Sequence, residues 1–359
     1  MQETADITIP LILQAFEPLT LASRALDSIH LFLDQRTRPH QPLLRPYLVR
    51  LAYELCGGRD WRSIVQACAA AEILNISSYQ ANVAFDGKLT IATQEERARQ
   101  FGCAMLSLDC AQDLLARMGL PSASIMFLIR GMQHANREMY LGQIMDLTEL
   151  QIDAVSKENA EAMIDIYSER CRRLGGAFTA WCLGVGGHLA GASELELARL
   201  SEIGIEMGTA GQMVNDIGDY VATTHSAIRA ETTRYQHVFS DVLNGKATYP
   251  ILHAFAIGAA TTTESARRIY REQEKDLSTL YSLSLDLRRI GAFDAARLVI
   301  RRHYSIARHL LRLFPRSTAR SHFAVALTAL THNKYFTSLR IAREADCPNV
   351  RNIADAQPL

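Results

Sequence analysis

Apolar residues recur at spacings of three and four along most of the chain, which is the period of one face of an α-helix. The longest runs with this spacing cover Trp61 to Gln80, Gln94 to Met118, Glu158 to Trp181 and Ser193 to Tyr220. Alternating apolar and polar positions, which would indicate half-buried strands, are rare. The pattern therefore predicts an all-α protein.

Proline and glycine positions agree with long helices. There is no proline from Ser122 to Tyr249, and an interior proline would cost a helix about 3 kcal/mol. Gly191 followed by Ser193 predicts the end of one helix and the N-cap of the next. The stretch 244–246, Asn-Gly-Lys, predicts a turn.

Composition places the chain among ordinary globular proteins. It has 359 residues, of which 48% are hydrophobic and 21% charged. No linker rich in proline, glycine or serine divides it, and no repeat is visible. We therefore expect one α-helical domain over residues 1–359, with residues 347–359 as a frayed polar tail.

Charge and cysteine content narrow the function classes. Lysine plus arginine equals aspartate plus glutamate at 38 each, and this balance speaks against a nucleic-acid partner. The seven cysteines form no C-x-x-C pair, which is typical of a reduced, cytoplasmic protein. No run of 18 apolar residues and no signal-peptide pattern occurs, so we expect no membrane span.

Two short polar clusters come at the ends of predicted helices. One holds Asn82 and Asp86; the other holds Asn215, Asp216 and Asp219. Residues three or four apart share a helix face, so each cluster is expected to converge. Mg²⁺ is commonly held by one or two carboxylates together with substrate phosphates. Taken alone, such clusters are more often helix caps or solvated ends.

Other short motifs occur along the chain together with these two clusters. They are Arg45-Pro46, Glu72-Ile73-Leu74 ahead of Asn82, Gly142-Gln143-Ile144-Met145-Asp146-Leu147, the stretch from Gly208 to Tyr220, and the stretch from Ser240 to Pro250. Together they resemble the trans-isoprenyl diphosphate synthases, or polyprenyl synthetase family, from about Arg45 to His253. The second half of the match is the more specific. The resemblance implies an isoprenoid synthase-type helical bundle around a deep apolar cavity.

The resemblance also implies a site. It assigns catalytic roles to Asp86, Asp216 and Asp219. It assigns Mg²⁺ binding to Asn82, Asp86, Asn215, Asp216 and Asp219. It assigns substrate binding to Arg45, Gln143, Gln212, Lys246, Ser78 and Phe85. The substrate would be a C10–C20 prenyl diphosphate, and the family usually forms homodimers through a helix face.

Departures from the family pattern affect both metal and substrate binding. Asn82 and Asn215 stand where each motif begins with aspartate, and an amide oxygen brings no charge to Mg²⁺. Pro42, Leu43 and the Leu174-Gly175 pair stand where the family has basic residues. Most of those cations belong to the isopentenyl diphosphate site. The sequence thus predicts an enzyme that does not elongate a chain with isopentenyl diphosphate.

Several functions fit these departures. The favoured one is Mg²⁺-dependent ionisation of an allylic diphosphate followed by cyclisation or other capture, as in a terpene synthase. Asn215-Asp216 matches the start of the terpene synthase metal motif, but Asp219 and Thr223 stand in its serine and glutamate places. The alternatives are prenyl transfer to another acceptor such as an aromatic, a non-catalytic regulatory subunit, and an atypical elongating synthase.

Overall fold

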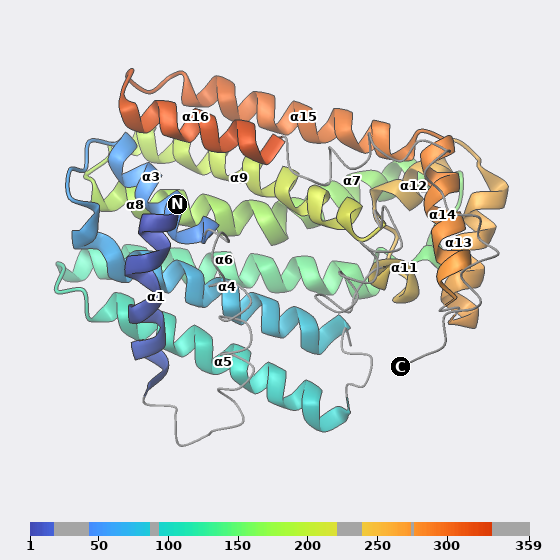
Figure 1. Cartoon of the computed structure of the whole chain (residues 1–359), viewed down its shortest axis with the longest axis horizontal. Helices are drawn as coiled ribbons and strands as arrows, with labels where there is room; N and C mark the ends of the chain where they lie inside the picture. Colours follow the sequence, from blue (N-terminus) through green and yellow to red (C-terminus); the bar gives the residue numbers. More distant parts are fainter. Residues whose placement is uncertain (18–42, 87–92, 221–238, 274–275, 332–359) are drawn as a thin grey trace. The chain divides into compact units, whose positions relative to one another are not determined.

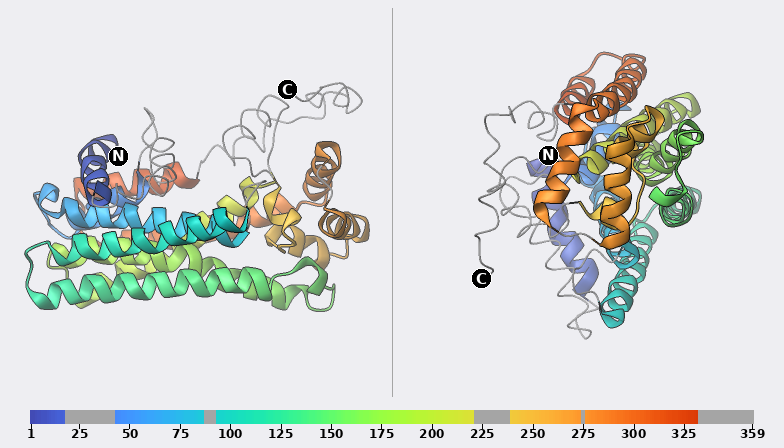
Figure 2. Two further views of the ribbon diagram at one scale, coloured as in Figure 1. Left: turned by 90° about the horizontal axis from the view of Figure 1, so that it is seen from below. Right: turned by 90° about the vertical axis from the view of Figure 1, so that its right-hand side faces the viewer.

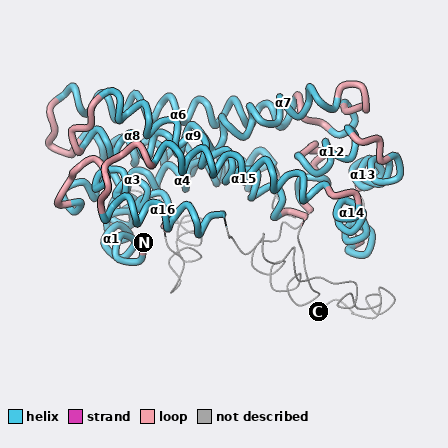
Figure 3. The backbone as a smooth tube through the Cα atoms, turned by 90° about the horizontal axis from the view of Figure 1, so that it is seen from above, coloured by secondary structure: helices cyan, strands magenta, loops and turns pink. Residues whose placement is uncertain are grey.

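The computed structural model describes residues 1–17, 43–86, 93–220, 239–273 and 276–331. Within these ranges every regular element is a helix (Figures 1 and 3), and the predicted all-α class is confirmed. The elements are α1 (Gln2–Phe16), α3 (Leu44–Leu55), η2 (Trp61–Ile64), α4 (Val65–Asp86), α5 (Gln94–Ala116), α6 (Ser122–Thr148), η3 (Ile152–Ala154), α7 (Ala160–Cys171), η4 (Arg172–Gly176), α8 (Ala177–Leu189), α9 (Glu194–Gly218), α11 (Ser240–Leu243), α12 (Tyr249–Ala256), α13 (Ala260–Glu272), α14 (Leu277–Arg289), α15 (Ala292–Leu311) and α16 (Thr318–Thr331).

The chain packs as two compact units. Unit 1 comprises residues 1–141, 172–208 and 305–327, and unit 2 comprises the remaining segments. The expectation of one domain over the whole chain stays a prediction. The predicted frayed tail, 347–359, and Pro42 lie outside the described residues.

In unit 1, α4 lies along α5, and α3 packs against both α4 and α8 (Figures 1 and 2). The sequence of α4 explains its close packing, because alanines and one cysteine at positions 67–71 are all fully buried. Small side chains let neighbouring helices approach closely. This helix carries the first polar cluster at its C-terminal end.

The predicted helix boundaries hold at most ends. Gly191 adopts φ +79° after α8, a left-handed conformation that favours glycine. Ser193 and Glu196 then form a capping box, in which the Ser193 amide donates to the Glu196 carboxylate at 2.8 Å. The predicted helix from Trp61 opens with a short 3₁₀ turn and runs to Asp86.

The apolar spacing from Glu158 to Trp181 predicts helix, and residues 160–181 are helical, but they are not α-helical throughout. The chain forms α7, then a π-helical turn, η4, and then α8. Gly208 of α9 lies against this π turn. A Cβ at Gly208 would lie 2.0 Å from the carbonyl oxygen of Gly175, so the two backbones touch. Such π turns are frequent at functional sites.

In unit 2, α12 packs on α7 and is followed by α13 and α14. Pro250 stands in the first turn of α12, where the missing N–H has no helical partner to lose. The unit is centred on large buried side chains, among them Tyr167, Tyr220 and Tyr304. The second polar cluster lies at the C-terminal end of α9, and that end also belongs to this unit.

No helix within the described ranges combines the length and apolar character that crossing a membrane requires.

Candidate active site

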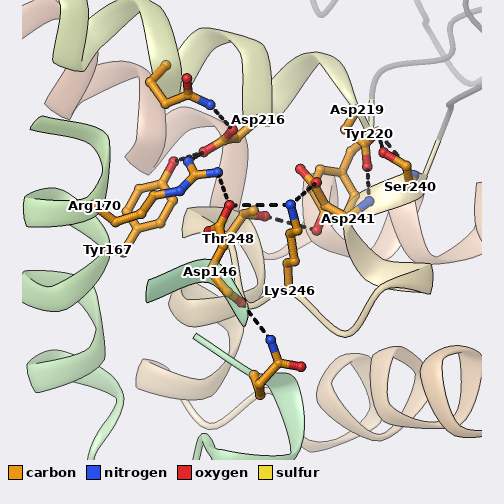
Figure 4. A network of polar contacts seen from close by, with 12 residues as sticks. Asp146, Tyr167, Arg170, Asp216, Asp219, Tyr220, Ser240, Asp241, Lys246 and Thr248 are labelled. Carbon is orange, nitrogen blue, oxygen red and sulfur yellow. Dashed lines mark hydrogen bonds and ion pairs between the residues drawn. The ribbon is translucent and has the colours of Figure 1, made fainter. Parts of the chain in front are cut away.

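Side chains from four separate segments of unit 2 meet in one buried polar network (Figure 4). Asp146 comes from α6, Tyr167 and Arg170 from α7, Asp216 from α9, and Lys246 from the turn after α11. The last three motifs recognised in the sequence, 142–147, 208–220 and 240–250, therefore converge here. We call these five residues the buried ion network.

Arg170 lies at the centre of the buried ion network. Its Nη1 donates to Oδ2 of Asp216 and its Nη2 to Oδ2 of Asp146, both at 2.6 Å. Its side chain is 3% exposed. Burial by itself lowers the pKa of this guanidinium, but Asp146 and Asp216 outweigh burial and raise the pKa well above its ordinary value. Arg170 is therefore a permanent internal cation.

Asp216 is fully engaged by donors from the protein. Besides Arg170, Tyr167 donates its hydroxyl to Oδ2 at 2.8 Å, and Gln212 donates Nε2 to Oδ1 at 2.9 Å. Burial, and then the charge of Asp216, raise the pKa of the Tyr167 phenol well above its ordinary value. Tyr167 thus stays a neutral donor at physiological pH.

Lys246 supplies the second cation of the network. Its Nζ lies 3.3 Å from Oδ2 of Asp146 and 3.9 Å from Oδ1 of Asp241. The backbone holds it in place, because Gln151 and Lys246 form an antiparallel bridge. Gly245, just before it, adopts φ +73° with the ring of Tyr270 packed against its Cα. The predicted turn at 244–246 is confirmed, and it delivers a buried lysine.

Asp219 acts as a cap at the start of α11. Its Oδ1 accepts from the Ser240 amide and hydroxyl, both at 3.1 Å, and its Oδ2 accepts from the Asp241 amide at 2.9 Å. Asn215 is exposed, whereas Asp216 beside it on α9 is buried. The expectation that Asn215, Asp216 and Asp219 converge is therefore wrong. Adjacent helix positions differ by about 100° in direction, and Asp219 lies beyond the helix end.

The first polar cluster lies at the end of α4 in unit 1. Oδ1 of Asn82 is buried and accepts no hydrogen bond from the described residues. The side chain of Asp86 lies outside the described part of the structure. Phe85 is 39% exposed and makes edge contacts with Phe101 and Tyr140.

The other predicted substrate-binding residues occupy varied settings. Arg45, half-buried on α3, donates to the Thr179 hydroxyl at 2.8 Å and stacks on the ring of Phe178 at 4.6 Å. Ser78 donates its hydroxyl back to the Asn75 carbonyl, a local helix contact. Gln143 is 5% exposed on α6, one turn before Asp146.

A groove of about 1050 Å³ lies elsewhere in unit 1, between α6, α8 and α9. Its lining includes Phe127, Arg130, His134 and Trp181. None of the predicted site residues lines it. The groove is therefore separate from the residues that the sequence singles out.

The two polar clusters differ in how well they fit a divalent metal. The described residues contain no group of three histidine, cysteine, aspartate or glutamate side chains that could hold one. In the second cluster, the oxygens of Asp216 and Asp219 already accept hydrogen bonds from arginine, tyrosine, glutamine, serine and backbone donors. That cluster does not fit Mg²⁺. The orphaned Oδ1 of Asn82 does fit, because Mg²⁺ takes amide oxygens as ligands.

Sequence reasoning missed Tyr167 and Arg170. A signal was present, because they are three residues apart and so share one helix face, and Tyr167 belongs to the apolar stripe of α7. Arginine near a helix end is usually solvated, which hides a buried one. The partners of Arg170 are 24 and 46 residues away in sequence, beyond the reach of local patterns.

Comparisons with known proteins agree with this architecture. A protein-family model described as Polyprenyl synthetase matches residues 88–284. A dimethylallyltranstransferase of Fischerella ambigua (strain UTEX 1903) is 26% identical over 255 residues, 68% of this chain and 68% of the relative.

Solved structures share the fold. A geranylgeranyl pyrophosphate synthetase from Pyrococcus horikoshii Ot3 gives a TM-score of 0.74 at 20% identity, covering 92% of this chain and 97% of that one. A geranylgeranyl pyrophosphate synthetase from the archaeon Geoglobus acetivorans gives 0.73 at 20% identity, covering 93% and 99%. The predicted isoprenoid synthase-type fold is confirmed.

Proposed function

This chain belongs to the polyprenyl synthetase family, and from that premise we propose that it transfers the prenyl group of an allylic prenyl diphosphate. One observation carries the proposal. The segments 142–147, 208–220 and 240–250 match the family's motifs, and they meet in the buried ion network although they are far apart in sequence (Figure 4). Random similarity of short motifs does not explain such convergence.

The reaction begins with departure of diphosphate, which leaves an allylic carbocation. Asn82 and Asp86, at the end of α4, would hold Mg²⁺, which supplies positive charge to the departing diphosphate when bound. The fit rests on the buried, unpaired Oδ1 of Asn82. Arg45 is the cation that we assign to a substrate phosphate, because a guanidinium presents five donors in a planar fork.

In this proposal the buried ion network of unit 2 positions other groups and takes no direct part in making or breaking bonds. Arg170 and Lys246 hold Asp146, Asp216 and Asp241 in a rigid arrangement, and Gln212 and Gln143 lie on the same two helices, α9 and α6. In this proposal the network fixes those helix ends, and Gln143 and Gln212 bind the diphosphate or its waters. Asp216 and Asp219, expected as catalytic residues, become positioning residues.

We propose an acceptor other than isopentenyl diphosphate. Leu174 stands in the π turn where the family has a lysine, and a leucine offers no charge to a second diphosphate. The cation would then be captured by a double bond of the same chain, by water or by an aromatic molecule. Ser78 and Phe85, on α4, are the residues that we assign to the prenyl chain itself.

Elongation with isopentenyl diphosphate is the second candidate. The relative from Fischerella ambigua is named dimethylallyltranstransferase, which describes transfer of a prenyl group. At 26% identity over 255 residues, that relative supports prenyl transfer without deciding the acceptor.

A homodimer is the assembly that we propose. The support within the structure is a set of large apolar side chains exposed on α5, including Phe101 and Met105, each 42% exposed. Exposed apolar patches often mark protein contacts. Light scattering on the purified chain gives the mass directly, and a monomer at micromolar concentration would contradict the dimer.

The function is tested by incubating the purified chain with Mg²⁺ and C10, C15 or C20 allylic diphosphates, each with and without isopentenyl diphosphate. We expect a hydrocarbon, alcohol or aromatic adduct without isopentenyl diphosphate, detected by mass spectrometry. A longer diphosphate formed only with it would identify the elongating alternative. Asn82→Ala should abolish the product, and Asp153→Asn, on an exposed ion pair, is the matched control. Turnover by Asn82→Ala at the wild-type rate would contradict the metal assignment.

A further inference from the structure

We infer that the buried carboxylates around Asp216 are paired with two of the chain's own cations, Arg170 and Lys246, and hold no divalent metal. These carboxylates are Asp146, Asp216 and Asp241, exposed by 2%, 1% and 6%. Arg170 bridges the first two, and Lys246 lies against the first and third. This pairing is independent of which acceptor the enzyme uses, so metal binding, not turnover, tests it.

The coordination of Asp216 leaves a metal no place. Oδ2 accepts two short hydrogen bonds, at 2.6 Å from Arg170 and 2.8 Å from Tyr167, and Oδ1 accepts from Gln212. Mg²⁺ requires near-octahedral oxygen ligands at about 2.0–2.1 Å. To reach Oδ2, the ion would have to displace both donors, and Arg170 and Tyr167 are buried on the same face of α7.

Displacing these donors would also take one carboxylate partner away from the guanidinium of Arg170. Arginine stays charged in proteins, and its two carboxylate partners are the groups that compensate its burial. A dication placed on Asp216 would repel Arg170 while withdrawing one of its partners. The buried cation and the metal are therefore mutually exclusive at this carboxylate.

The remaining members of the motif do not restore a metal site. Asp219 accepts three hydrogen bonds at the start of α11, so it caps that helix. Asn215 is exposed and uncharged. Asn215 thus offers a neutral amide where a metal pair would need a second carboxylate, and an amide binds Mg²⁺ more weakly than a carboxylate.

The test counts Mn²⁺ ions bound to the full chain by electron paramagnetic resonance, with Mn²⁺ alone and with inorganic diphosphate added. We expect Asp216→Asn to bind the same number of ions as the wild type under both conditions. Asp153→Asn, an exposed aspartate of the same unit paired with Arg271, is the matched control. Loss of one Mn²⁺ equivalent in Asp216→Asn, with none lost in Asp153→Asn, would overturn the inference.

A double-substitution cycle checks the pairing itself. Arg170→Met leaves the buried Asp216 without a cation and removes one of the two cations beside Asp146, so its melting temperature should fall by on the order of 10 °C. The double variant Arg170→Met with Asp216→Asn should recover part of that loss, since one uncompensated charge is removed. Strictly additive losses would show that the two residues do not pair. If neither variant folds, the Mn²⁺ count on Asp216→Asn decides.

Discussion

The hydroxyl of Tyr167 donates a 2.8 Å hydrogen bond to Oδ2 of Asp216, the same oxygen that Arg170 contacts. Both residues are buried, Tyr167 at 1% exposure and Asp216 at 1%. A neutral donor and a cation thus share one carboxylate oxygen away from water. This pair joins α7 to α9 within unit 2, and it yields two predictions.

Tyr167→Phe should destabilise the protein by about 1–3 kcal/mol, because it removes the donor and leaves a buried carboxylate less satisfied. The ring and its packing are kept. Urea unfolding followed by circular dichroism measures the change. Tyr249→Phe, on a half-buried tyrosine that stacks with His253, is the control and should stay within about 0.5 kcal/mol. Equal effects of the two substitutions would show that the hydrogen bond contributes nothing.

Alkaline pH should weaken the wild type more than Tyr167→Phe. Burial and Asp216 raise the pKa of Tyr167 well above its ordinary value of 10.0. Above that pH the unfolded chain has lost a proton that the folded chain keeps, so stability falls by about 1.4 kcal/mol per pH unit for each such group. Tyr220, whose pKa is raised by burial and then by Asp241 and Asp219, keeps a residual slope in the variant. Unfolding free energies from pH 9 upward would be compared, and parallel curves would contradict the assignment.

Asp219→Ala should cost about 1–2 kcal/mol, because it removes the carboxylate that accepts from the first amides of α11, as an N-cap side chain would. Asp219→Asn retains an acceptor for the Ser240 amide and should cost less. Both are measured by urea unfolding, with activity assayed in parallel. A variant of normal stability that has lost all activity would instead indicate direct contact with substrate or metal.

Gly208→Ala should destabilise unit 1 by about 1–3 kcal/mol, because the new Cβ would lie 2.0 Å from the Gly175 carbonyl oxygen. Gly184→Ala is the matched control on α8, where an added Cβ meets nothing within 4 Å. It should stabilise the helix by about 0.5–1 kcal/mol. The two unfolding curves should therefore shift in opposite directions. A neutral Gly208→Ala would show that α9 can move away from the π turn at no cost.

Helix positions and most ends could be predicted from the sequence because they depend on local patterns. Apolar spacing, Gly191, Ser193 and the absence of proline each act within a few residues. The direction of the second cluster could also have been predicted. Met213 and Ile217 are buried on one stripe of α9, and Asp216 falls beside that stripe whereas Asn215 is exposed.

The pairing of the buried carboxylates with internal cations could not be predicted in the same way. Arg170 finds its partners through tertiary packing of α6, α7 and α9, and nothing within α7 alone says that its guanidinium is buried. The π turn after α7 is equally a product of close packing, since Gly208 and Gly175 are distant in sequence. Family motifs located the carboxylates, but only the packed structure shows which donors reach them.

The contribution of the buried ion network to the stability of unit 2 should change with temperature. Hydration of charged groups carries a negative entropy, so removing Arg170, Lys246 and their carboxylates from water becomes less costly as temperature rises. Hydrophobic stabilisation per unit of buried area reaches a plateau over the same range. The network therefore contributes a growing share of the stability of unit 2 on warming, which makes it a feature suited to thermal tolerance.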